Sequence, residues 1–513
     1  MVAAARGPEA AREVEIKLEF DPADRVGIER HPLLVTARPD KETLVSVYFD
    51  TEDRALWKAK MALRVRKVGQ RYVQTLKGAD GAAELFDRPE WEWETSGLEP
   101  DLSLVEETPA GTCLDGHARA VLKPLFRTRI ERILYQLPNG GSQIELAIDL
   151  GEIEADAQWS PVHELELELK RGEPRDLFRL ARHLAADIPL RLAVKTKAER
   201  GYDLAEGAAG GPEKARPIAL DKDMICAQAF RAIGENCLRQ IIANEPLVEA
   251  GEAEALHQMR VGLRRLRAAI AVFAKMTADS EQERIKDELK WITSELGPAR
   301  DLDVFTADIL KPLAKSGDHA AARSAFAEAR AKAYQSATGS IRSDRFRKAL
   351  LDIAEWIEVG PWTVGEAFAK LRERKIGEHA AKRLARLRSR VRDKGEDLRE
   401  LSSKKRHKLR IEAKTLRYAV EFFARLFPDG EMAKPRETAL SALKDMQDEL
   451  GALNDIAQRQ ALASETLGGD GHDLGAQAAK LLAADEEEVE RRLKRAEAAY
   501  ERFAKVKAFW NDL

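Results

Sequence analysis

The sequence has few of the features that mark a secreted, membrane-embedded or disulfide-bonded protein. It contains three cysteines in 513 residues, Cys113, Cys226 and Cys237, and no two of them form a CxxC pair. An odd number of widely spaced cysteines argues against a disulfide framework and against a zinc site. No run approaches the roughly 18 consecutive apolar residues that a membrane-spanning helix needs, and the first residues lack the apolar segment of a secretory signal. We therefore expect a cytoplasmic protein that does not enter a membrane.

An excess of charge of either sign is also lacking. The chain has 85 basic and 88 acidic side chains and a formal net charge of −3. Bulk electrostatics therefore favours neither a nucleic acid nor a membrane surface as a partner. The arrangement of the charges along the chain has to supply that information.

The period of the sequence changes near its middle. Up to about residue 204, charged and apolar residues alternate, as in Glu13-Val-Glu15-Ile-Lys17-Leu-Glu19-Phe, and this alternation predicts strands with one charged and one apolar face. Further along the chain the period becomes 3.6, which is typical of helices. The residues between the two halves are rich in Gly, Ala and Pro. We predict an α+β fold with a strand domain over 10–204, a linker over 205–217 and an all-helical domain over 218–513.

Whole strands of the first half carry charge of a single sign. A sheet with one wet face is the usual explanation of alternating charge, but such a face normally mixes both signs with Thr, Ser and Gln. If the strands close into a barrel with their charged faces inward, the carboxylates need a hard divalent cation and the guanidinium groups need a polyanion. A metal ion together with a phosphate chain meets both needs. The single-sign sets are Glu13/Glu15, Glu90/Glu92/Glu94, Glu164/Glu166/Glu168, Arg64/Arg66 and Arg127/Arg129.

The motif Glu13-Val-Glu15-Ile-Lys17, followed by six further landmarks in order, resembles the CYTH, or triphosphate tunnel metalloenzyme, family. The resemblance spans residues 13–202. It implies an eight-stranded antiparallel β-tunnel with helices that hydrolyses inorganic triphosphate with Mg²⁺ or Mn²⁺. The further landmarks are Tyr48-Phe-Asp50-Thr, Ala62-Leu-Arg64-Val-Arg66, Gln74-Thr-Leu-Lys77-Gly, Ile148-Asp149-Leu-Gly-Glu152, Glu164-Leu-Glu166-Leu-Glu168-Leu and Lys197-Ala-Glu-Arg200-Gly-Tyr202.

The resemblance also implies roles for individual residues. A metal-held water is the expected nucleophile, and Lys17 and Lys77 are candidates for the general base if neighbouring cations lower their pKa values. The choice between Lys195 and Lys197 as the tunnel lysine stays open. The implied metal ligands are Glu13, Glu15, Glu164 and Glu166, with Glu92 and Asp149 as helpers. The implied phosphate path consists of Lys17, Arg64, Arg66, Lys77, Arg127, Arg129 and Lys197.

The helical half contains one phrase twice, 150 residues apart. His257-Gln-Met-Arg260-Val-Gly-Leu-Arg264-Arg-Leu-Arg267 and His407-Lys-Leu-Arg410-Ile-Glu-Ala-Lys414-Thr-Leu-Arg417 both place basic side chains at offsets 0, 3, 7 and 10. On a helix these offsets fall within about 80° of one another. Leu-Gly-x-x-(Arg/Asn)-Asp then follows each phrase, at Leu296–Asp301 and Leu450–Asp455. This order indicates an internal duplication, with repeats over about 218–360 and 361–513.

A doubled cationic helix face is best explained as a receptor for an extended anion. Most charged helix faces are simply solvated, but this one has few acidic partners and occurs twice. Nucleic acid is a competing ligand because cationic helices bind phosphate backbones. The absence of interleaved aromatic residues for base stacking makes nucleic acid the weaker hypothesis.

The doubled motif resembles the CHAD domain, a conserved-histidine α-helical domain. The resemblance implies a pair of four-helix bundles related by a pseudo-twofold axis, with a basic central cavity that binds inorganic polyphosphate. The second copy has Thr415 and Asn454 where the first has Arg265 and Arg300, which predicts weaker binding on that side. The implied polyphosphate-binding residues are His257, Arg260, Arg264, Arg265, Arg267, Arg300, His407, Arg410, Lys414 and Arg417.

We therefore expect a metal-dependent inorganic triphosphatase fused to a polyphosphate-binding module. A nucleoside or thiamine triphosphatase or an adenylate cyclase on the same tunnel is an alternative, because Trp57, Trp91 and Trp93 leave a base pocket open. A non-catalytic polyphosphate-binding protein is an alternative from a different class. The sequence indicates neither the oligomeric state nor any coupling between the modules.

Overall fold

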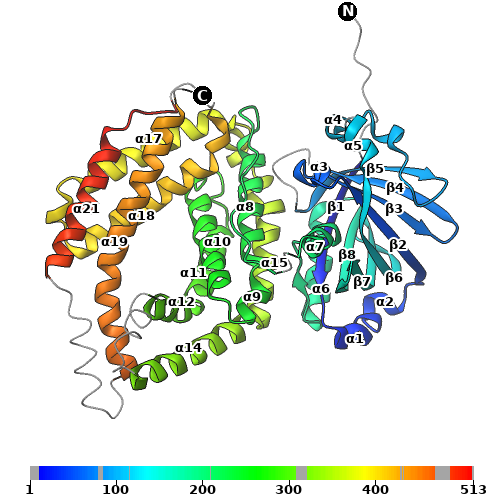
Figure 1. The fold of residues 1–513 in the computed structure, drawn as a ribbon, viewed down its shortest axis with the longest axis horizontal. Coiled ribbons are helices and arrows are strands. Elements are labelled where there is room, and N and C mark those ends of the chain that lie inside the picture. Colours follow the sequence, from blue (N-terminus) through cyan, green and yellow to red (C-terminus); the bar gives the residue numbers. More distant parts are fainter. Residues whose placement is uncertain are drawn as a thin grey trace, which may run out of the picture. The chain divides into compact units, whose positions relative to one another are not determined.

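The structure of the protein is a computed structural model that describes residues 11–78, 85–114, 116–207, 210–307, 320–427, 430, 432–467 and 486–510 (Figure 1). The chain forms two compact units. Met1–Glu213, Ile242–Leu247 and Arg342–Val359 make up the first, and Lys214–Ile241, Val248–Ile341 and Gly360–Leu513 make up the second. The domain boundaries at residues 204 and 218 stay predictions, since Arg342–Val359 groups with the first unit although it lies in the helical half.

The first unit is built on a closed antiparallel β-barrel (Figure 1). Eight strands follow one another in the order β5-β4-β3-β2-β6-β7-β8-β1, and pairing between β1 and β5 closes the barrel. The short β9 adds to β1. The predicted eight-stranded antiparallel barrel is therefore confirmed. The strands are β1 (Ala11–Glu19), β2 (Asp40–Asp50), β3 (Ala62–Val68), β4 (Arg71–Lys77), β5 (Asp87–Thr95), β6 (Lys123–Asn139), β7 (Ser142–Ala155), β8 (Gln158–Arg171) and β9 (Arg191–Leu192).

The barrel carries its charged side chains inside, as β1 illustrates. Ile16 and Leu18 are buried on one face of β1, and the amphipathic helix α6 (Pro174–Asp187) packs against β1 and β8 from outside. Glu15 and Lys17 lie on the opposite face, because successive side chains of a strand point to opposite sides. The apolar face of the strand is therefore covered by a helix, and the charged face lines the interior.

Helix α7 (Lys197–Ala205) is fixed against β6, β7 and β8. Thr196 and Glu199 form a capping box that starts the helix at Lys197. Gly201 lies against the ring of Phe126 so closely that a Cβ atom would overlap it. The hydroxyl of Tyr202 donates to Asp50 Oδ2 at 2.9 Å. These contacts hold Lys197 at the wall of the barrel.

Short helices complete the first unit. Two of them lie between Pro109 and Ala120, and Asp115 between these two lies outside the described residues. The helices are α1 (Arg25–Glu29), α2 (Pro32–Val35), α3 (Ala55–Lys58), α4 (Pro109–Cys113), α5 (Gly116–Ala120) and, from the helical half, α15 (Asp344–Val359).

The second unit is helical, and its helix boundaries repeat. Helices α10 (Ala253–Val272) and α18 (Ser403–Phe422) each have 20 residues and begin 150 residues apart. Helices α8 (Cys226–Ile242) and α17 (Ile376–Gly395) also begin 150 residues apart. Helices α10 and α18 pack against each other. Within the described ranges, no helix is long and apolar enough to cross a membrane. The remaining helices are α9 (Glu245–Glu249), α11 (Gln282–Glu295), α12 (Gly297–Phe305), α14 (Ala320–Ile341), α16 (Ala369–Arg372), α19 (Ala433–Leu467) and α21 (Glu486–Lys505).

The two copies differ after their cationic helices. The sequence predicts a helix break near residue 452, but α19 runs continuously from Ala433 to Leu467. In the first copy, α11 ends at Glu295 and α12 starts at Gly297, with Pro298 in its first turn. Proline has no amide hydrogen to continue a helix, and Ala452 of the second copy imposes no such break. The helix expected over 473–511 is described only as α21, because residues 468–485 lie outside the described residues.

Candidate functional site

Charged side chains from most strands meet inside the barrel. Lys77 of β4 bonds to Glu13 of β1 and lies 3.2 Å from Glu90 of β5. Arg64 of β3 lies 3.7 Å from the same Glu90. Each of these pairs except Lys77–Glu90 skips an intervening strand, which requires side chains on the same interior face. The interior is therefore one continuous network of acids and bases.

Lys197 occupies the centre of the strongest part of this network. Its ammonium group lies 2.6 Å from Glu164, 2.9 Å from Glu166 and 2.9 Å from Asp149. Burial opposes the charge of Lys197, but these carboxylates outweigh it and raise its pKa. Lys195 forms an ion pair with Asp203 instead, at 2.9 Å. The choice left open by the sequence is thereby resolved in favour of Lys197.

Lys17 bridges the two acidic strands β1 and β8. It bonds to Glu15 and lies 3.9 Å from Glu166. Burial lowers the pKa of Lys17 to about 8, and the cations Arg88 and Lys77 act in the same direction against Glu166. Burial is therefore the main cause of the lowered pKa of Lys17, and the neighbouring cations contribute less.

Two other interior groups, Glu13 and Arg66, are charged at neutral pH. Burial acts to raise the pKa of Glu13, but Lys77 and Lys17 outweigh it and lower that pKa to about 2. Burial, with Arg64 and Arg132 nearby, lowers the pKa of Arg66 to about 10. The interior thus presents ionised carboxylates beside cations at neutral pH.

In the helical unit, the first copy of the cationic phrase forms a compact cluster with α12. Arg260 donates to the carbonyl of Thr293 at 2.7 Å, which anchors its guanidinium near Gly297. Burial, with Arg300 and Arg264 nearby, lowers the pKa of His257. The electrostatic effects of Arg260, Arg264 and Arg300 on one another and on His257 show that these four residues lie together.

The second copy reproduces the contact between arginine and glycine in a tighter form. A Cβ atom added to Gly451 would lie 2.8 Å from Arg410 Nη2, whereas one added to Gly297 would lie 3.8 Å from Arg260 Nη1. The repeated Leu-Gly motif therefore leaves room for a guanidinium group on the neighbouring helix. Arg417 donates to Gln447 at 3.1 Å and to Glu421 at 2.6 Å. His407 is exposed on α18, and the side chain of Lys414 is partly buried on it.

Comparison with known families separates the two halves of the chain. Residues 11–202 match the CYTH domain and residues 232–464 match the CHAD domain. The chain contains a CYTH domain followed by a CHAD domain. The CYTH part is 32% identical over 202 residues to the inorganic triphosphatase of Haemophilus influenzae, and the match covers 37% of this chain and 54% of that protein. The chain therefore spans about half the length of this relative.

The structure is also similar to the CHAD domain from the plant Ricinus communis. The TM-score is 0.52 and the sequence identity is 27%, and the match covers 58% of this chain and 99% of that domain. This likeness supports the assignment of the helical half, because the whole of the plant domain has a counterpart here.

Arg132 lies in the CYTH tunnel, although it was not predicted there from the sequence. Arg132 of β6 donates to Asp149 through Nε at 2.7 Å and through Nη2 at 2.6 Å, and Nη2 also donates to Glu166 at 2.6 Å. Arg127 and Arg129, the predicted tunnel residues of this strand, are exposed on its opposite face. The register pairs Arg132 with Asp149 and Asp149 with Glu164. Cross-strand partners share a face of the sheet. Pairing Asp149, a predicted interior residue, with its partner on β6 would therefore have identified Arg132 as an interior residue.

A similar correction applies to β5. Glu90 enters the network with Lys77 and Arg64, whereas Glu92, the predicted metal helper, is exposed and accepts a hydrogen bond from Thr75 at 3.1 Å. Both glutamates lie on the same face of β5, so period two alone does not distinguish them. Their burial does, since Glu90 is half-buried and Glu92 is exposed.

The carboxylates of the CYTH tunnel have the chemistry that a hard divalent cation requires. Glu13, Glu15 and Glu166 all lie around Lys17, and carboxylate oxygens are the ligands that Mg²⁺ and Mn²⁺ prefer. Among the described residues, no group of three or more acidic, histidine or cysteine side chains has the geometry of a preformed metal site.

Two predicted residues of the CHAD domain lie apart from the His257 cluster. Arg265 is buried, donates to Asn236 and Gln240 at 2.9 Å each, and stacks its guanidinium over Phe422 at 5.5 Å. It therefore has a packing position between α8, α10 and α18. Arg267 is exposed near the end of α10.

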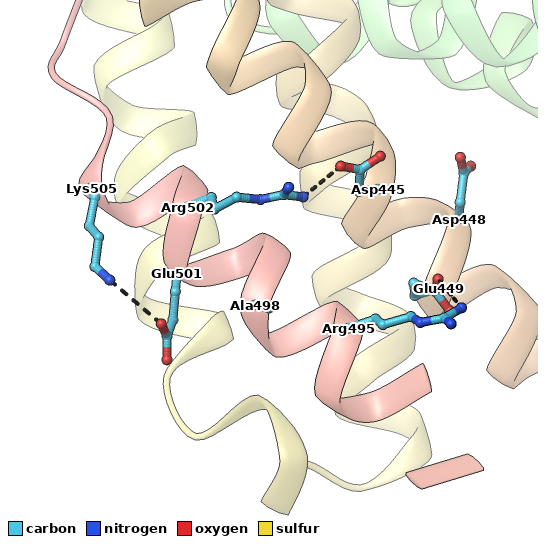
Figure 2. Close-up of a pocket in the computed structure, with 8 residues that line it drawn as sticks. All are labelled: Asp445, Asp448, Glu449, Arg495, Ala498, Glu501, Arg502 and Lys505. Carbon is cyan, nitrogen blue, oxygen red and sulfur yellow. Dashed lines mark hydrogen bonds and ion pairs between the residues drawn. The ribbon is translucent and has the colours of Figure 1, made fainter. Parts of the chain in front are cut away.

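A groove of about 570 Å³ between α19 and α21 differs from both cationic helices (Figure 2). Arg502 bonds to Asp445 at 2.5 Å, and Arg495 lies 3.7 Å from Glu449. Its acidic and basic groups thus neutralise one another, which makes the groove a poor receptor for a polyanion.

Proposed function

We propose that the CYTH domain hydrolyses inorganic triphosphate with the help of a divalent cation, and that the CHAD domain binds inorganic polyphosphate. The observation that carries the first part is the interior network, in which basic groups from four strands and α7 alternate with carboxylates. The similarity to an inorganic triphosphatase supports the same reaction.

The basic side chains of the tunnel would bind the phosphate chain. Arg64, Arg66 and Arg132 present guanidinium forks that match phosphate oxygens, and Lys197 adds a point charge. Arg64, Arg132 and Lys197 would exchange carboxylate oxygens for phosphate oxygens, and Arg66 would exchange the hydroxyl of Ser46. Their fixed positions stabilise the charge that develops on the terminal phosphoryl group during transfer.

In the proposed reaction, a water oxygen forms a bond to the terminal phosphorus atom. The bond from that phosphorus to the bridging oxygen breaks, its electron pair stays on the leaving pyrophosphate, and the proton of the water passes to a base. Lys17 is the better of the two candidate bases, because burial lowers its pKa to about 8. Lys77 is the second candidate, at the Glu13 and Glu90 end of the network.

A Mg²⁺ or Mn²⁺ ion would be held by Glu13, Glu15 and Glu166, with Glu164 and Asp149 beside them. Bound there, it supplies additional charge stabilisation at the phosphoryl oxygens and makes a bound water more acidic. Glu90 takes the supporting position that the sequence assigns to Glu92, by ordering Lys77 and Arg64.

An inorganic substrate is favoured over a nucleotide because the tryptophans already pack against the protein. Trp57 stacks on Tyr202 with centroids 4.3 Å apart and an interplanar angle of 13°. Trp91 and Trp93 pack against the core cluster around Leu63 and Leu76. A nucleobase would have to displace these contacts.

For the CHAD domain, the supporting observation is the cluster of His257, Arg260, Arg264 and Arg300 on α10 and α12, together with the recurrence of its sequence motif on α18. A polyanion that contacts both would neutralise charges that lie close together with few acidic partners. The functional test is release of phosphate from tripolyphosphate, ATP and thiamine triphosphate with Mg²⁺ or Mn²⁺, together with retention on immobilised polyphosphate. Hydrolysis of ATP or thiamine triphosphate faster than tripolyphosphate would replace the proposed substrate.

A further inference from the structure

A second cationic feature of the CHAD domain lies away from the predicted anion face. A cavity of about 190 Å³ opens where α10 ends and α17 begins. Six of its ten lining residues are basic, and among the described residues that line it none is acidic. The basic ones are Lys275, Arg374, His379, Lys382, Arg383 and Arg386.

The cavity is separate from the His257 cluster. His257 lies near the start of α10 and the cavity lies at its end, 15 residues further along the helix. At a rise of about 1.5 Å per residue, this corresponds to about 22 Å. None of the lining residues belongs to the duplicated phrase. The cavity therefore needs an explanation of its own.

His379 is held rigidly with one nitrogen unused. Its ring stacks on Phe273 with centroids 4.8 Å apart and an interplanar angle of 8°, and it forms a hydrogen bond to the backbone of Val272. Its Nε2 atom is buried and has no hydrogen-bond partner within the described part of the chain. Nδ1 therefore makes the backbone bond, and Nε2 is left for a ligand.

Arg383 presents an unused donor beside the same cavity. One of its terminal nitrogens donates to the carbonyl of Ala271, which fixes the guanidinium. Its Nε atom is buried without a partner among the described residues. A buried donor such as Arg383 Nε costs free energy when it has no partner, and Nε2 of neutral His379 becomes a second donor in the same cationic space once the ring takes up a proton. An oxyanion would satisfy both.

We propose that this cavity is a binding site for a single tetrahedral oxyanion of the phosphate type, held by Arg383, His379 and the surrounding basic side chains. The volume suits a small group, since a water molecule in the liquid occupies roughly 30 Å³. A free phosphate ion and the end of a polyphosphate chain present the same chemistry. The site shares no residue with the His257 and His407 faces and stands independently of the proposed function.

Anion binding at this site is coupled to the proton on His379. Burial, with Arg383 and Arg374 nearby, lowers the pKa of His379 to about 4, so the ring of the free protein is neutral at pH 7. Lys275, Lys382 and Arg386 line the same space, and Glu412 of α18 acts on Arg383. A bound anion favours the charged imidazole and raises the pKa. By linkage, affinity increases as the pH falls.

The test is nuclear magnetic resonance of the full-length protein with ¹³C-labelled histidine. The chain has nine histidines, and the signal that His379→Gln removes identifies His379. We expect added sulfate, whose charge is constant over this range of pH, to shift that signal and raise its midpoint of titration. Arg383→Gln should weaken the response about tenfold or more, the effect of losing a charge-assisted hydrogen bond. If His379→Gln does not fold, Arg383→Gln carries the comparison.

A matched control is Arg392→Gln, which removes an exposed charge from the same helix and should leave the response unchanged. The proposal would be overturned if neither sulfate nor phosphate shifted the His379 signal at any pH. It would also be overturned if the signal shifted as much in Arg383→Gln as in the unmodified protein. Inorganic phosphate and long-chain polyphosphate, added separately at equal phosphate concentration, distinguish a free ion from a chain end. Tripolyphosphate hydrolysis and polyphosphate retention measured on the same samples report separately on the proposed function.

Discussion

Arg132 grips Asp149 with two parallel hydrogen bonds of 2.7 and 2.6 Å and reaches Glu166 with the second of its nitrogens. The Arg132 guanidinium lies between carboxylates from β7 and β8, and it could donate the same hydrogen bonds to phosphate oxygens instead. It also orients both carboxylates. This contact connects the anion-binding and the metal-binding sides of the proposed reaction.

Replacing Arg132 by Gln should therefore lower kcat/KM for tripolyphosphate by about 10²- to 10³-fold, the usual cost of removing a fixed donor to transition-state charge. Arg127→Gln on the exposed face of the same strand should change it less than about twofold. Steady-state phosphate release, with the melting temperature of each variant as a control, checks this pair. Equal losses of kcat/KM in both variants would contradict the position of Arg132 inside the barrel and of Arg127 outside it.

Replacing Gly451 by Ala should displace the guanidinium of Arg410, since the new Cβ would lie 2.8 Å from Nη2. We expect a fall in polyphosphate affinity of roughly three- to tenfold, part of one charge-assisted hydrogen bond. Gly297→Ala is the matched control, because its Cβ would make an ordinary contact of 3.8 Å with Arg260. Calorimetric titration with long-chain polyphosphate measures both, and an unchanged affinity in Gly451→Ala would show that Arg410 is not a ligand.

Reversing Arg264 and Arg417 to Glu should abolish retention on immobilised polyphosphate, with a loss of about a hundredfold or more. Tripolyphosphate hydrolysis by the same variant should be preserved, since both residues lie outside the CYTH domain. Arg502→Glu, in the groove of Figure 2, makes the same change of charge at a neutralised site and should leave retention in place. Retention of the double variant on polyphosphate would show that the basic faces of α10 and α18 do not form the ligand site.

Polyphosphate affinity should rise as the pH falls. Burial and the cations Arg300 and Arg264 lower the pKa of free His257, whereas a bound polyanion favours the charged ring and raises that pKa. The complex therefore takes up a proton, and binding strengthens as the pH falls through the raised pKa of His257 in the complex. His257→Gln should flatten this dependence. A slope that survives the substitution would assign the proton to another group.

The sequence was sufficient to predict where most interior charges lie, for a physical reason. Between Glu13 and Glu19 of β1 and between Glu164 and Lys170 of β8, only one face carries charge, so period two identifies Glu13, Glu15, Glu164 and Glu166 as partners on one side. In β6, the charged residues Arg127, Arg129 and Glu131 lie on the outer face, and Arg132 is the single charge on the inner face. The longer charged run was therefore taken for the interior one.

Other features depended on local chemistry that the period does not contain. The capping box of Thr196 and Glu199 makes Lys197 the first residue of its helix and directs Lys195 to Asp203. The sequence holds this signal as a Thr and a Glu three residues apart. The cavity at His379 could not be predicted, because its basic residues come together only when the end of α10 meets the start of α17.

The most direct measurement is phosphate release from tripolyphosphate by the full-length protein with Mg²⁺ or Mn²⁺, after removal of metal with EDTA, and in Glu166→Gln. We predict release only with the metal and a loss of about a hundredfold or more in Glu166→Gln. Glu131→Gln, an exposed carboxylate on β6, should retain the activity of the unmodified protein. Release that continues without metal, or a Glu166→Gln variant as active as the Glu131→Gln variant, would contradict the proposed metal-dependent tunnel hydrolase.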